Sequence, residues 1–242
     1  MQSEPYVALS AQTTLEKRMT SIALNVANIN TVGYRGAGVN FGTYVVQNGE
    51  DPVAYATKGK DYISQTQGPL IKTGNPLDMA VQGDGYFAIQ TPAGTAYTRD
   101  GRMQLTPGGA VQTVNGYPIL DAGGAPLQLD PNGGEVAIAR DGMITQGGRQ
   151  LGAVGLYEMP PGANFTRVDN SAVIPDKDAT PILAFDNNGV IQGHVEGSNV
   201  NPVLEMAKMM TISRAIESIS NAAQSNESTL KDAIKTLGDN NS

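Results

Sequence analysis

Apolar residues recur at helical spacing near both ends of the chain and at strand spacing between them. Near the N-terminus, large apolar residues alternate at intervals of four and three positions, the heptad pattern of a helix that packs along another helix. They are Leu15, Met19, Ile22, Val26 and Ile29. Residues 6–29 contain no Gly or Pro, and Gly33 follows as a residue suited to a left-handed stop. The pattern predicts an N-terminal helix that runs towards Gly33.

A second helix is predicted from Asn201 onward. Asn201 is a favourable N-cap, Pro202 fits the first helical position, and Glu205 favours the positive end of the helix dipole. The apolar stripe of this helix again has mostly heptad spacing and consists of Ile212, Ile216, Ile219, Ala223, Leu230, Ala233 and Leu237. Nearby methionines also have helix spacing, and we interpret them as adaptable packing residues that bind no metal. They are Met206, Met209 and Met210.

Between the helices, short apolar runs alternate with glycine-containing turns, which indicates strands joined by tight turns. Gly83-Asp84-Gly85 separates two such runs. Arg-Asp-Gly occurs at residues 99–101 and again at 140–142, each time followed by a Met-containing run and a Gly-Gly pair. This recurrence suggests an internal structural repeat of two copies. We expect the Asp-Gly turns to close hairpins. The predicted fold is a mainly β central domain, antiparallel and rich in hairpins, with N- and C-terminal α-helices pairing as a coiled coil.

Composition narrows the possible chemistry. The 16 Lys and Arg residues against 23 Asp and Glu give a net charge of −7, which argues against a nucleic-acid binder. The chain has no Cys and a single histidine, His194, which excludes disulfides, thiolate nucleophiles and multi-His metal sites. No apolar stretch approaches the length of a membrane span, and the first residues lack the pattern of a cleaved secretory signal, so we expect neither.

Three local features suggest chemistry, and each has a simpler interpretation. Gly83-Asp84-Gly85 superficially matches a dinucleotide-binding loop, but it leads into a strand-like run where that loop requires a helix. Asp186-Asn187-Asn188-Gly189 lacks the ligand spacing of a calcium loop and is better interpreted as a turn. His194 has no Gly-x-Ser-x-Gly nucleophile motif to act with. We therefore expect no enzyme, no cofactor and no metal site.

Two kinds of segment look incomplete on their own. Residues 33–75 have few apolar runs and isolated tyrosines, and we interpret them as an extended connector. An isolated helix of the predicted kind is marginal in water, so each terminal stripe must pack on something. The candidates are the other terminal helix and the same helices of neighbouring subunits. The alternative is a helical hairpin that caps one domain within a single chain.

Three blocks of sequence resemble those of the bacterial flagellar rod and hook proteins. The first covers residues 8–12 and 22–35 (IALNVANINTVGYR), the second covers 74–87, 98–101 and 115–118, and the third covers 196–203 with Met206. The blocks occur in the order of that family and cover nearly the whole chain. One departure is that Ile216 follows Arg214-Ala215, where the family usually has an aromatic residue.

The resemblance implies a structural subunit of the flagellar basal-body rod, part of an axial drive shaft whose terminal helices form an inner tube. The short length is most like that of the proximal rod members. A distal rod or hook subunit, or a stand-alone ligand-binding β domain, is the alternative. The implied division is an axial helix (1–32), an extended connector (33–75), a β-rich outer domain (76–193), and a C-terminal segment with the second axial helix (194–242).

The resemblance also implies partners and a location. The partners are other flagellar rod proteins, copies of the same chain and the flagellar type III export apparatus, with no nucleic acid and no membrane insertion. The location is the periplasmic rod of the basal body, reached without a cleaved signal peptide.

The predicted assembly interface lies on the two terminal helices. The family's N-terminal asparagines match Asn25, Asn28 and Asn30, and we expect Asn25 and Asn28 to share a helix face, where buried amides can fix the register between helices. The full set is Leu15, Met19, Ile22, Asn25, Val26, Asn28, Ile29, Asn30, Met206, Met209, Ile212, Ile216, Ile219, Ala223, Leu230 and Leu237.

Overall fold

The structure, a computed structural model, describes residues 4–48, 51–57 and 59–239. Within these ranges, the side chains of residues 4–6, 43–56 and several positions beyond residue 225 are not described. The chain forms two compact units. The helical unit comprises Met1–Val26, Ala37–Tyr62 and Asn201–Ser242, and the β unit comprises Ala27–Gly36 and Ile63–Val200.

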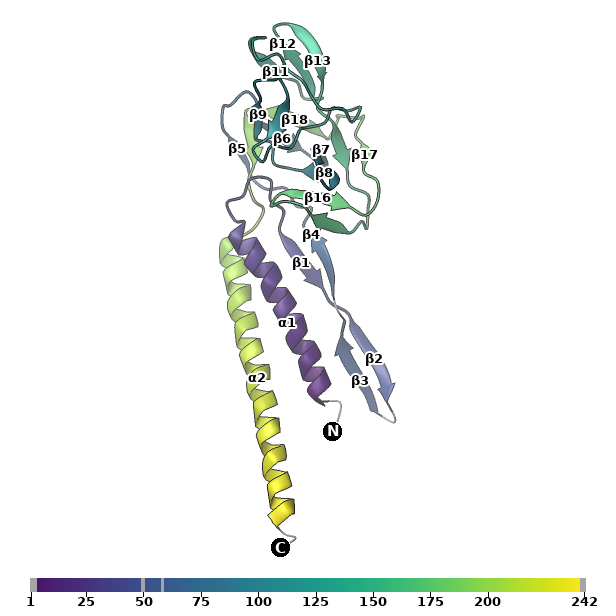
Figure 1. Cartoon of the computed structure of the whole chain (residues 1–242), viewed down its shortest axis with the longest axis vertical. Coiled ribbons are helices and arrows are strands. Elements are labelled where there is room, and N and C mark those ends of the chain that lie inside the picture. The colour runs from purple at the N-terminus through teal and green to yellow at the C-terminus, as the bar shows by residue number, and fades with distance from the viewer. Residues whose placement is uncertain (1–3, 49–50, 58, 240–242) are drawn as a thin grey trace. The chain divides into compact units, whose positions relative to one another are not determined.

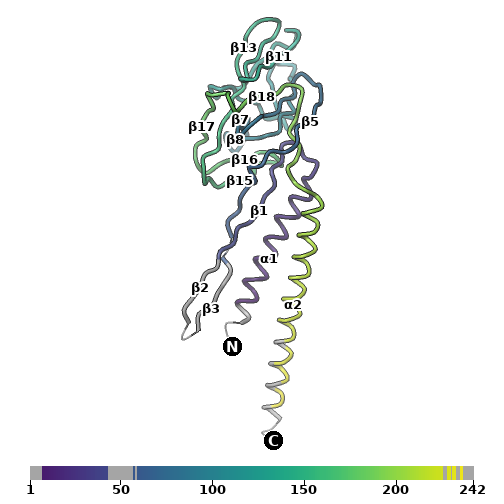
Figure 2. Tube along the Cα trace, turned by 180° about the vertical axis from the view of Figure 1, so that it is seen from behind, coloured from purple at the N-terminus to yellow at the C-terminus, as the bar shows by residue number. Residues whose placement is uncertain are grey.

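The helical unit contains two long helices and two short ribbons. Helix α1 (Glu4–Ala27) and helix α2 (Pro202–Asp239) lie side by side and run in opposite directions, as both Figure 1 and Figure 2 show. Strand β1 (Ala37–Asn40) pairs with β4 (Lys60–Ile63). Strand β2 (Thr43–Asn48) pairs antiparallel with β3 (Asp51–Ala56). The stretch interpreted as a connector therefore carries strands.

The start of α2 is confirmed. The Leu204 amide donates to the Asn201 side chain (N–Oδ1, 3.1 Å), so Asn201 caps the helix and Pro202 is its first residue.

The predicted end of the first helix is wrong, because α1 stops at Ala27. Asn28, Ile29 and Asn30 thus lie beyond the helix, and Asn28 does not share a helix face with Asn25. Local turns replace the helix here. The Thr31 amide bonds to the Asn28 carbonyl (3.2 Å), and the Thr31 hydroxyl bonds to the Asn28 side chain (2.9 Å).

The β unit is antiparallel in every strand pairing described for it. Its strands are β5 (Leu70–Lys72), β6 (Met79–Gln82), β7 (Gly85–Thr91), β8 (Gly94–Thr98), β9 (Met103–Leu105), β10 (Val111–Thr113), β11 (Val136–Ile138), β12 (Met143–Gln146), β13 (Arg149–Ala153), β14 (Leu156–Glu158), β15 (Phe165–Arg167), β16 (Ala172–Pro175), β17 (Thr180–Pro181), β18 (Gly189–Gln192) and β19 (His194–Glu196). Six of them form one sheet in the order β15-β16-β8-β7-β14-β17. The expectation of a mainly antiparallel β domain flanked by terminal helices is confirmed.

The turns divide into local hairpins and longer connections. The Asp-Gly turn at 141–142 closes the β11–β12 hairpin, as predicted. The Gly-Gly pairs at 108–109 and 147–148 close the β9–β10 and β12–β13 hairpins, which were not predicted. The segment 83–85 does not close a hairpin, because β6 pairs with β18 while β7 pairs with β8 and β14. The segment 99–101 likewise joins two different sheets. The hairpin prediction is wrong at both turns, because the strand before each turn pairs with strands other than the one that follows it.

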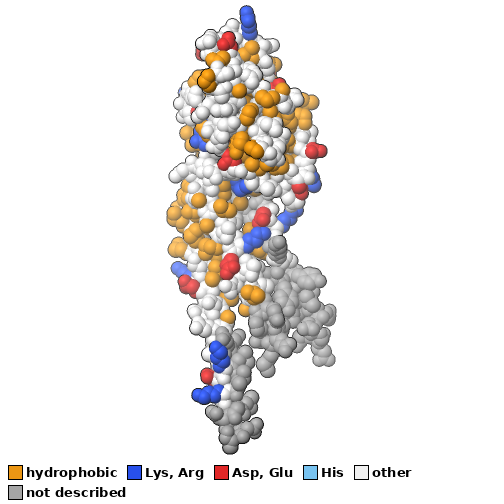
Figure 3. Space-filling view, in the orientation of Figure 1, with side chains coloured by type: hydrophobic (Ala, Val, Ile, Leu, Met, Phe, Trp, Pro, Cys, Tyr) orange, Lys and Arg blue, Asp and Glu red, His pale blue; other side chains and the backbone are white. Residues whose placement is uncertain are grey.

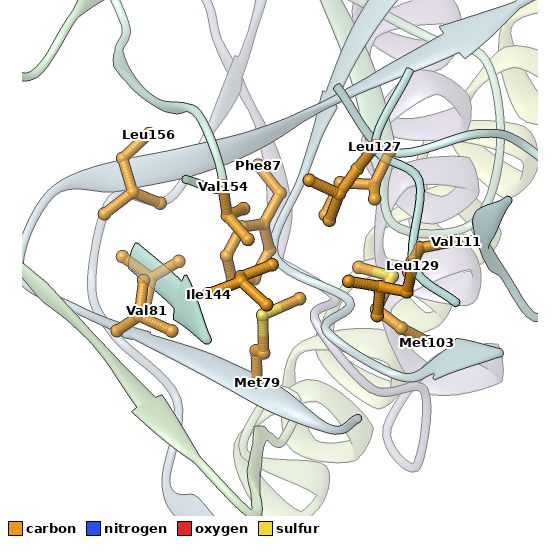
Figure 4. Packing of buried hydrophobic residues seen from close by; sticks show 12 residues of the cluster. Met79, Val81, Phe87, Met103, Val111, Leu127, Leu129, Ile144, Val154 and Leu156 are labelled. Atoms are coloured by element: carbon orange, nitrogen blue, oxygen red, sulfur yellow. The ribbon is translucent and has the colours of Figure 1, made fainter. Parts of the chain in front are cut away.

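The core of the β unit is aliphatic with one central aromatic ring. Phe87 is fully buried, and side chains from several sheets converge on it (Figure 4). The labelled members are Met79, Val81, Phe87, Met103, Val111, Leu127, Leu129, Ile144, Val154 and Leu156. Phe87 and Leu156 come from the six-stranded sheet and the others from smaller sheets and connecting segments, so their burial holds these parts together as one unit.

Candidate assembly interface

Asn25 joins three elements of the helical unit. Its side chain accepts a hydrogen bond from the Ala37 amide (2.8 Å) and donates to the Ala37 carbonyl (2.8 Å) and to Glu205 Oε2 (3.1 Å). Glu205 is buried and its Oε1 pairs with the Nζ of Lys208 at 2.7 Å. The amide of Asn25 therefore links α1 to β1 and to the first turn of α2.

The predicted interface residues differ in how far this chain alone covers them. Ile22, Asn25 and Ile212 are buried. Those half-buried are Leu15, Met19, Val26, Asn28, Ile29, Met209, Ile216 and Ile219, and those exposed are Asn30, Met206 and Ala223. The side chains of Leu230 and Leu237 lie outside the described part of the chain. A large share of the stripe therefore remains open to water.

A further apolar face on α2 includes Met206, a member of the predicted interface. Val203, Met206 and Met210 are spaced as neighbours on one side of the helix and are 75%, 51% and 56% exposed. Figure 3 shows hydrophobic side chains gathered over this part of α2. The sequence analysis identified Met206 and Met210 as packing residues, and Val203 is the member of this face that it did not predict. The charged residues Arg214 and Glu217 occupy the next turns of this side.

A groove of about 590 Å³ lies between α1, β1 and α2 in the helical unit. Arg18 and Lys208 contribute positive charge to its lining, and Ile22 and Ile212 contribute apolar surface. The Arg18 guanidinium also lies over the Phe41 ring at 5.1 Å from the ring centroid. The groove is thus open and of mixed polarity, unlike the closed apolar pocket of a typical small-molecule site.

The β unit contains a buried ion cluster, which we call the ion clamp and define as Arg35, Arg99 and Glu196. Glu196 is fully buried and accepts from Arg35 Nε at 2.8 Å, from Arg99 Nη1 at 3.0 Å and from the Gly68 amide at 3.1 Å. Arg35 also donates to the Gln65 carbonyl. Both carboxylate oxygens are therefore engaged, and two arginines share one counter-charge.

Aromatic rings cover the arginines of this region. The Arg99 guanidinium lies 4.7 Å from the centroid of Tyr86, and that of Arg167 lies 4.4 Å from the centroid of Tyr34. Burial raises the pKa of Tyr86, an effect that the positive charges of Arg35 and Arg99 oppose. Burial, followed by the charge of Arg35, lowers the pKa of Arg99, and burial lowers the pKa of Arg167. Arg35, Arg99 and Glu196 are thus shielded from water, while Arg167 is half-buried beside them.

Asn199 ties together the same chain segments. Its Oδ1 accepts from the Gly36 amide at 2.8 Å, and its Nδ2 donates to the Thr66 carbonyl at 2.6 Å and to Ser64 Oγ at 3.2 Å. Sequence reasoning did not single out Asn199, Arg35, Arg99 or Glu196 as functional. The signal existed, because all four lie inside the blocks that carry the family resemblance.

Neither a metal site nor a membrane-spanning helix is found among the described residues. Among residues 4–48, 51–57 and 59–239, no group of three or more His, Asp or Glu side chains is placed to hold a metal ion. Within the same ranges, no helix is both long enough and apolar enough to cross a membrane. His194 Nδ1 lies 3.0 Å from the Gln192 carbonyl oxygen.

Comparisons with known proteins define the class. The chain matches three family models: "Flagella basal body rod protein" over residues 6–35, "Flagellar hook protein FlgE/F/G D1 domain" over 80–146 and "Flagellar basal body rod FlgEFG protein C-terminal" over 191–236. It is therefore a structural protein of the flagellar rod and hook class, which is not a class of enzymes.

Relatives narrow this class to one family. The chain is 48% identical to the flagellar basal-body rod protein FlgF of Mesorhizobium japonicum and 44% identical to that of Rhizobium meliloti, in each case over 98% of this chain and 99% of the relative. It is 28% identical to the rod protein FlgG of Bacillus subtilis over 95% of this chain and 97% of the relative. The chain belongs to the FlgF family of flagellar basal-body rod proteins.

Proposed function

We propose that this rod subunit assembles through its two terminal helices, which pair with each other and with the helices of neighbouring copies and other rod proteins. The observation that carries the proposal is the apolar surface that α2 leaves open. Val203, Met206 and Met210 are all more than half exposed on one side of that helix. Full burial of each such side chain stabilises by about 1.5–3 kcal/mol, so a helix of a neighbour laid along this side gains several kcal/mol.

The other parts of the chain have distinct roles in the proposed assembly. Residues 1–32 and 194–242 supply the axial helices, which pack in the manner of a coiled coil, and residues 76–193 form the outer domain. Residues 33–75 connect the two, and the β1–β4 and β2–β3 ribbons lie within that connector. The proposed site of action is the proximal rod in the periplasm, reached by flagellar type III export without cleavage of a signal peptide.

The exposed face of α2 allows assembly to be tested without disturbing the fold. In Met210→Asp the new charge sits on a side chain that is 56% exposed in the single chain, so the purified variant should unfold at the wild-type temperature. Buried in an assembled rod, the same charge has no partner and is strongly unfavourable. We expect loss of motility and loss of the subunit from purified basal bodies when the variant replaces the wild type.

Asn187→Asp is the control, because it adds the same charge at an exposed turn position of the β unit. Leu15→Asp and Ile216→Asp extend the test to the half-buried seam of both helices and should also block incorporation. Normal motility and normal incorporation of Met210→Asp, Leu15→Asp and Ile216→Asp would overturn the proposal.

A further inference from the structure

A small cavity lies beside the ion clamp, in the β unit. It measures about 10 Å³, close to the space that one water molecule needs. Its polar lining consists of Arg35, Gln65, Tyr86, Arg167 and Ser171, and Val173 adds apolar surface. The cavity is therefore too small for an organic ligand and matches a single water molecule.

One lining group is buried without a hydrogen-bond partner. Arg35 is only 3% exposed, and its Nη2 atom has no partner among the described residues. The other nitrogens of this guanidinium are engaged, Nε with Glu196 and Nη1 with the Gln65 carbonyl. The guanidinium lies 6.0 Å from the centroid of the Tyr86 ring, at the outer limit of a cation–π contact, so the ring does not replace an acceptor. Because an unsatisfied buried donor is costly, above all a charged one, an acceptor for Nη2 is strongly favoured.

The lining can also accept the two protons of a water molecule. The Tyr86 hydroxyl donates to Gln65 Oε1 at 2.9 Å and keeps its own lone pairs for another donor. Ser171 Oγ lies 3.1 Å from Thr98 Oγ1, and a hydroxyl oxygen has two acceptor sites. A water that accepts from Arg35 and donates to Tyr86 and Ser171 makes three hydrogen bonds, which is the usual number for a buried water.

The same lining suits an anion poorly. Arg167 is half-buried and already engaged, since its Nη1 donates to the Asn170 carbonyl at 3.1 Å and its Nη2 donates to the Arg35 carbonyl. Arg35 itself pairs with Glu196. Among the described residues, Arg35 Nη2 is thus the one buried lining atom that lacks a partner. One donor beside two hydroxyl acceptors calls for a neutral group that both accepts and donates.

We propose that the cavity binds one structural water molecule, which accepts a hydrogen bond from Arg35 Nη2 and donates to the hydroxyls of Tyr86 and Ser171. Tyr86 belongs to β7, and Ser171 directly precedes β16, so the water extends the ion clamp to the six-stranded sheet. The inference does not depend on how the helices assemble.

The water can be observed directly in the full-length protein. A crystal structure at a resolution that shows ordered water should have a density peak in the cavity, about 2.7–3.2 Å from Arg35 Nη2. Crystals soaked in bromide should show no anomalous scattering peak there. In solution, protein protons next to the cavity should give NOE and ROE cross-peaks to water of opposite sign, which mark a water that is held rather than free.

The direction of one stability change separates a wet cavity from a dry one. Val173 on β16 is 5% exposed, and Val173→Ile adds one methylene beside the cavity. Filling a dry cavity would raise the ratio of folded to unfolded protein about fourfold, the gain from burying one methylene. Expelling a water that satisfies Arg35 should instead lower this ratio about tenfold in urea unfolding, because a charged donor loses its acceptor.

A second variant separates loss of the water from simple overpacking. Arg35→Lys keeps a positive charge for Glu196 but has no Nη2 atom. In the Arg35→Lys background, Val173→Ile should therefore lose most of its destabilising effect, whereas a loss caused by overpacking alone would be the same in both backgrounds. If Arg35→Lys fails to fold, the crystallographic and NMR measurements on the wild type still decide.

Four results would each overturn the proposal. A cavity without density, or a stabilising effect of Val173→Ile, would show that the cavity is dry. A bromide peak would show that an ion occupies the cavity. An equal loss from Val173→Ile in both backgrounds would show that Arg35 does not depend on a bound water.

Discussion

Replacing Glu196 by Gln tests whether the ion clamp holds the β unit together. The glutamine has nearly the same shape as the glutamate, so the packing of the core is kept. It removes the single negative charge that faces Arg35 and Arg99, whose side chains are only 4% and 1% exposed. It also places an amide donor where the carboxylate accepted from Arg35, Arg99 or Gly68, so one of those donors loses its acceptor.

The expected loss of stability follows from this geometry. Removing one partner of a buried ion pair costs about 3–5 kcal/mol, because the remaining charge stays buried without compensation. For a unit of this size, 1 kcal/mol corresponds to about 2–4 °C in Tm, so Glu196→Gln should lower the unfolding temperature of the β unit by about 6–20 °C. The effect should be local at first, since the clamp bonds to segments around residues 35, 65 and 196.

Urea unfolding followed by tyrosine fluorescence measures the loss, since the chain has no Trp. Glu135→Gln removes an exposed carboxylate from the same unit and should change stability by less than about 0.5 kcal/mol. Combining Glu196→Gln with Arg99→Met removes one of the stranded charges, so the double variant should be more stable than the sum of the two single losses predicts. A loss below about 1 kcal/mol for Glu196→Gln, or simple additivity in the double variant, would refute the reasoning.

Two further predictions concern the same unit. Gly33 has φ of +70°, and a Cβ there would lie 2.2 Å from the Asp100 amide nitrogen, so Gly33→Ala should lower stability by more than about 2 kcal/mol in urea unfolding. Gly148→Ala meets the same left-handed backbone with open space around it and should cost only about 1 kcal/mol, and equal losses would contradict the clash argument. Burial raises the pKa of Tyr86 above its ordinary value of 10.0, so the unfolded chain loses this proton first and stability should fall as the pH rises above 10. Tyr86→Phe should reduce this fall in urea unfolding measured on either side of pH 10, and an unchanged slope would show that the Tyr86 hydroxyl does not titrate as described.

The sequence predicted best those features that depend on neighbouring residues. The capping side chain of Asn201 and the conformation of Pro202 act within one turn of helix, so the start of α2 was found at the correct residue. The hairpin at the Asp-Gly turn 141–142 was found for the same reason, because its strands β11 and β12 both adjoin the turn.

Features that depend on distant partners were missed. The turn at 83–85 resembles a hairpin locally, but β6 pairs with β18, whose residues lie more than 100 positions away in the register Gly189↔Gln82. The end of α1 was placed too late because the Gly33 amide bonds to the Glu196 carbonyl at 2.7 Å, a contact with no local signal. The ion clamp itself joins residues 161 positions apart, and periodicity and composition do not report such contacts.

The ion clamp lies close in sequence to the points where the chain enters and leaves the β unit. The backbone passes between the helical unit and the β unit after residues 26, 36, 62 and 200. Arg35, Gln65 and Glu196 lie close to three of these crossings, and their side-chain and backbone bonds hold the three segments to one another within the β unit.

Buried apolar residues in place of the clamp could be equally stable, since buried ion pairs often add little net stability. An apolar contact, however, tolerates small shifts between its partners. A guanidinium that moves away from Glu196 remains buried without a counter-charge, which costs several kcal/mol per ion. We infer that the clamp contributes a fixed register between the crossing segments more than it contributes free energy of folding.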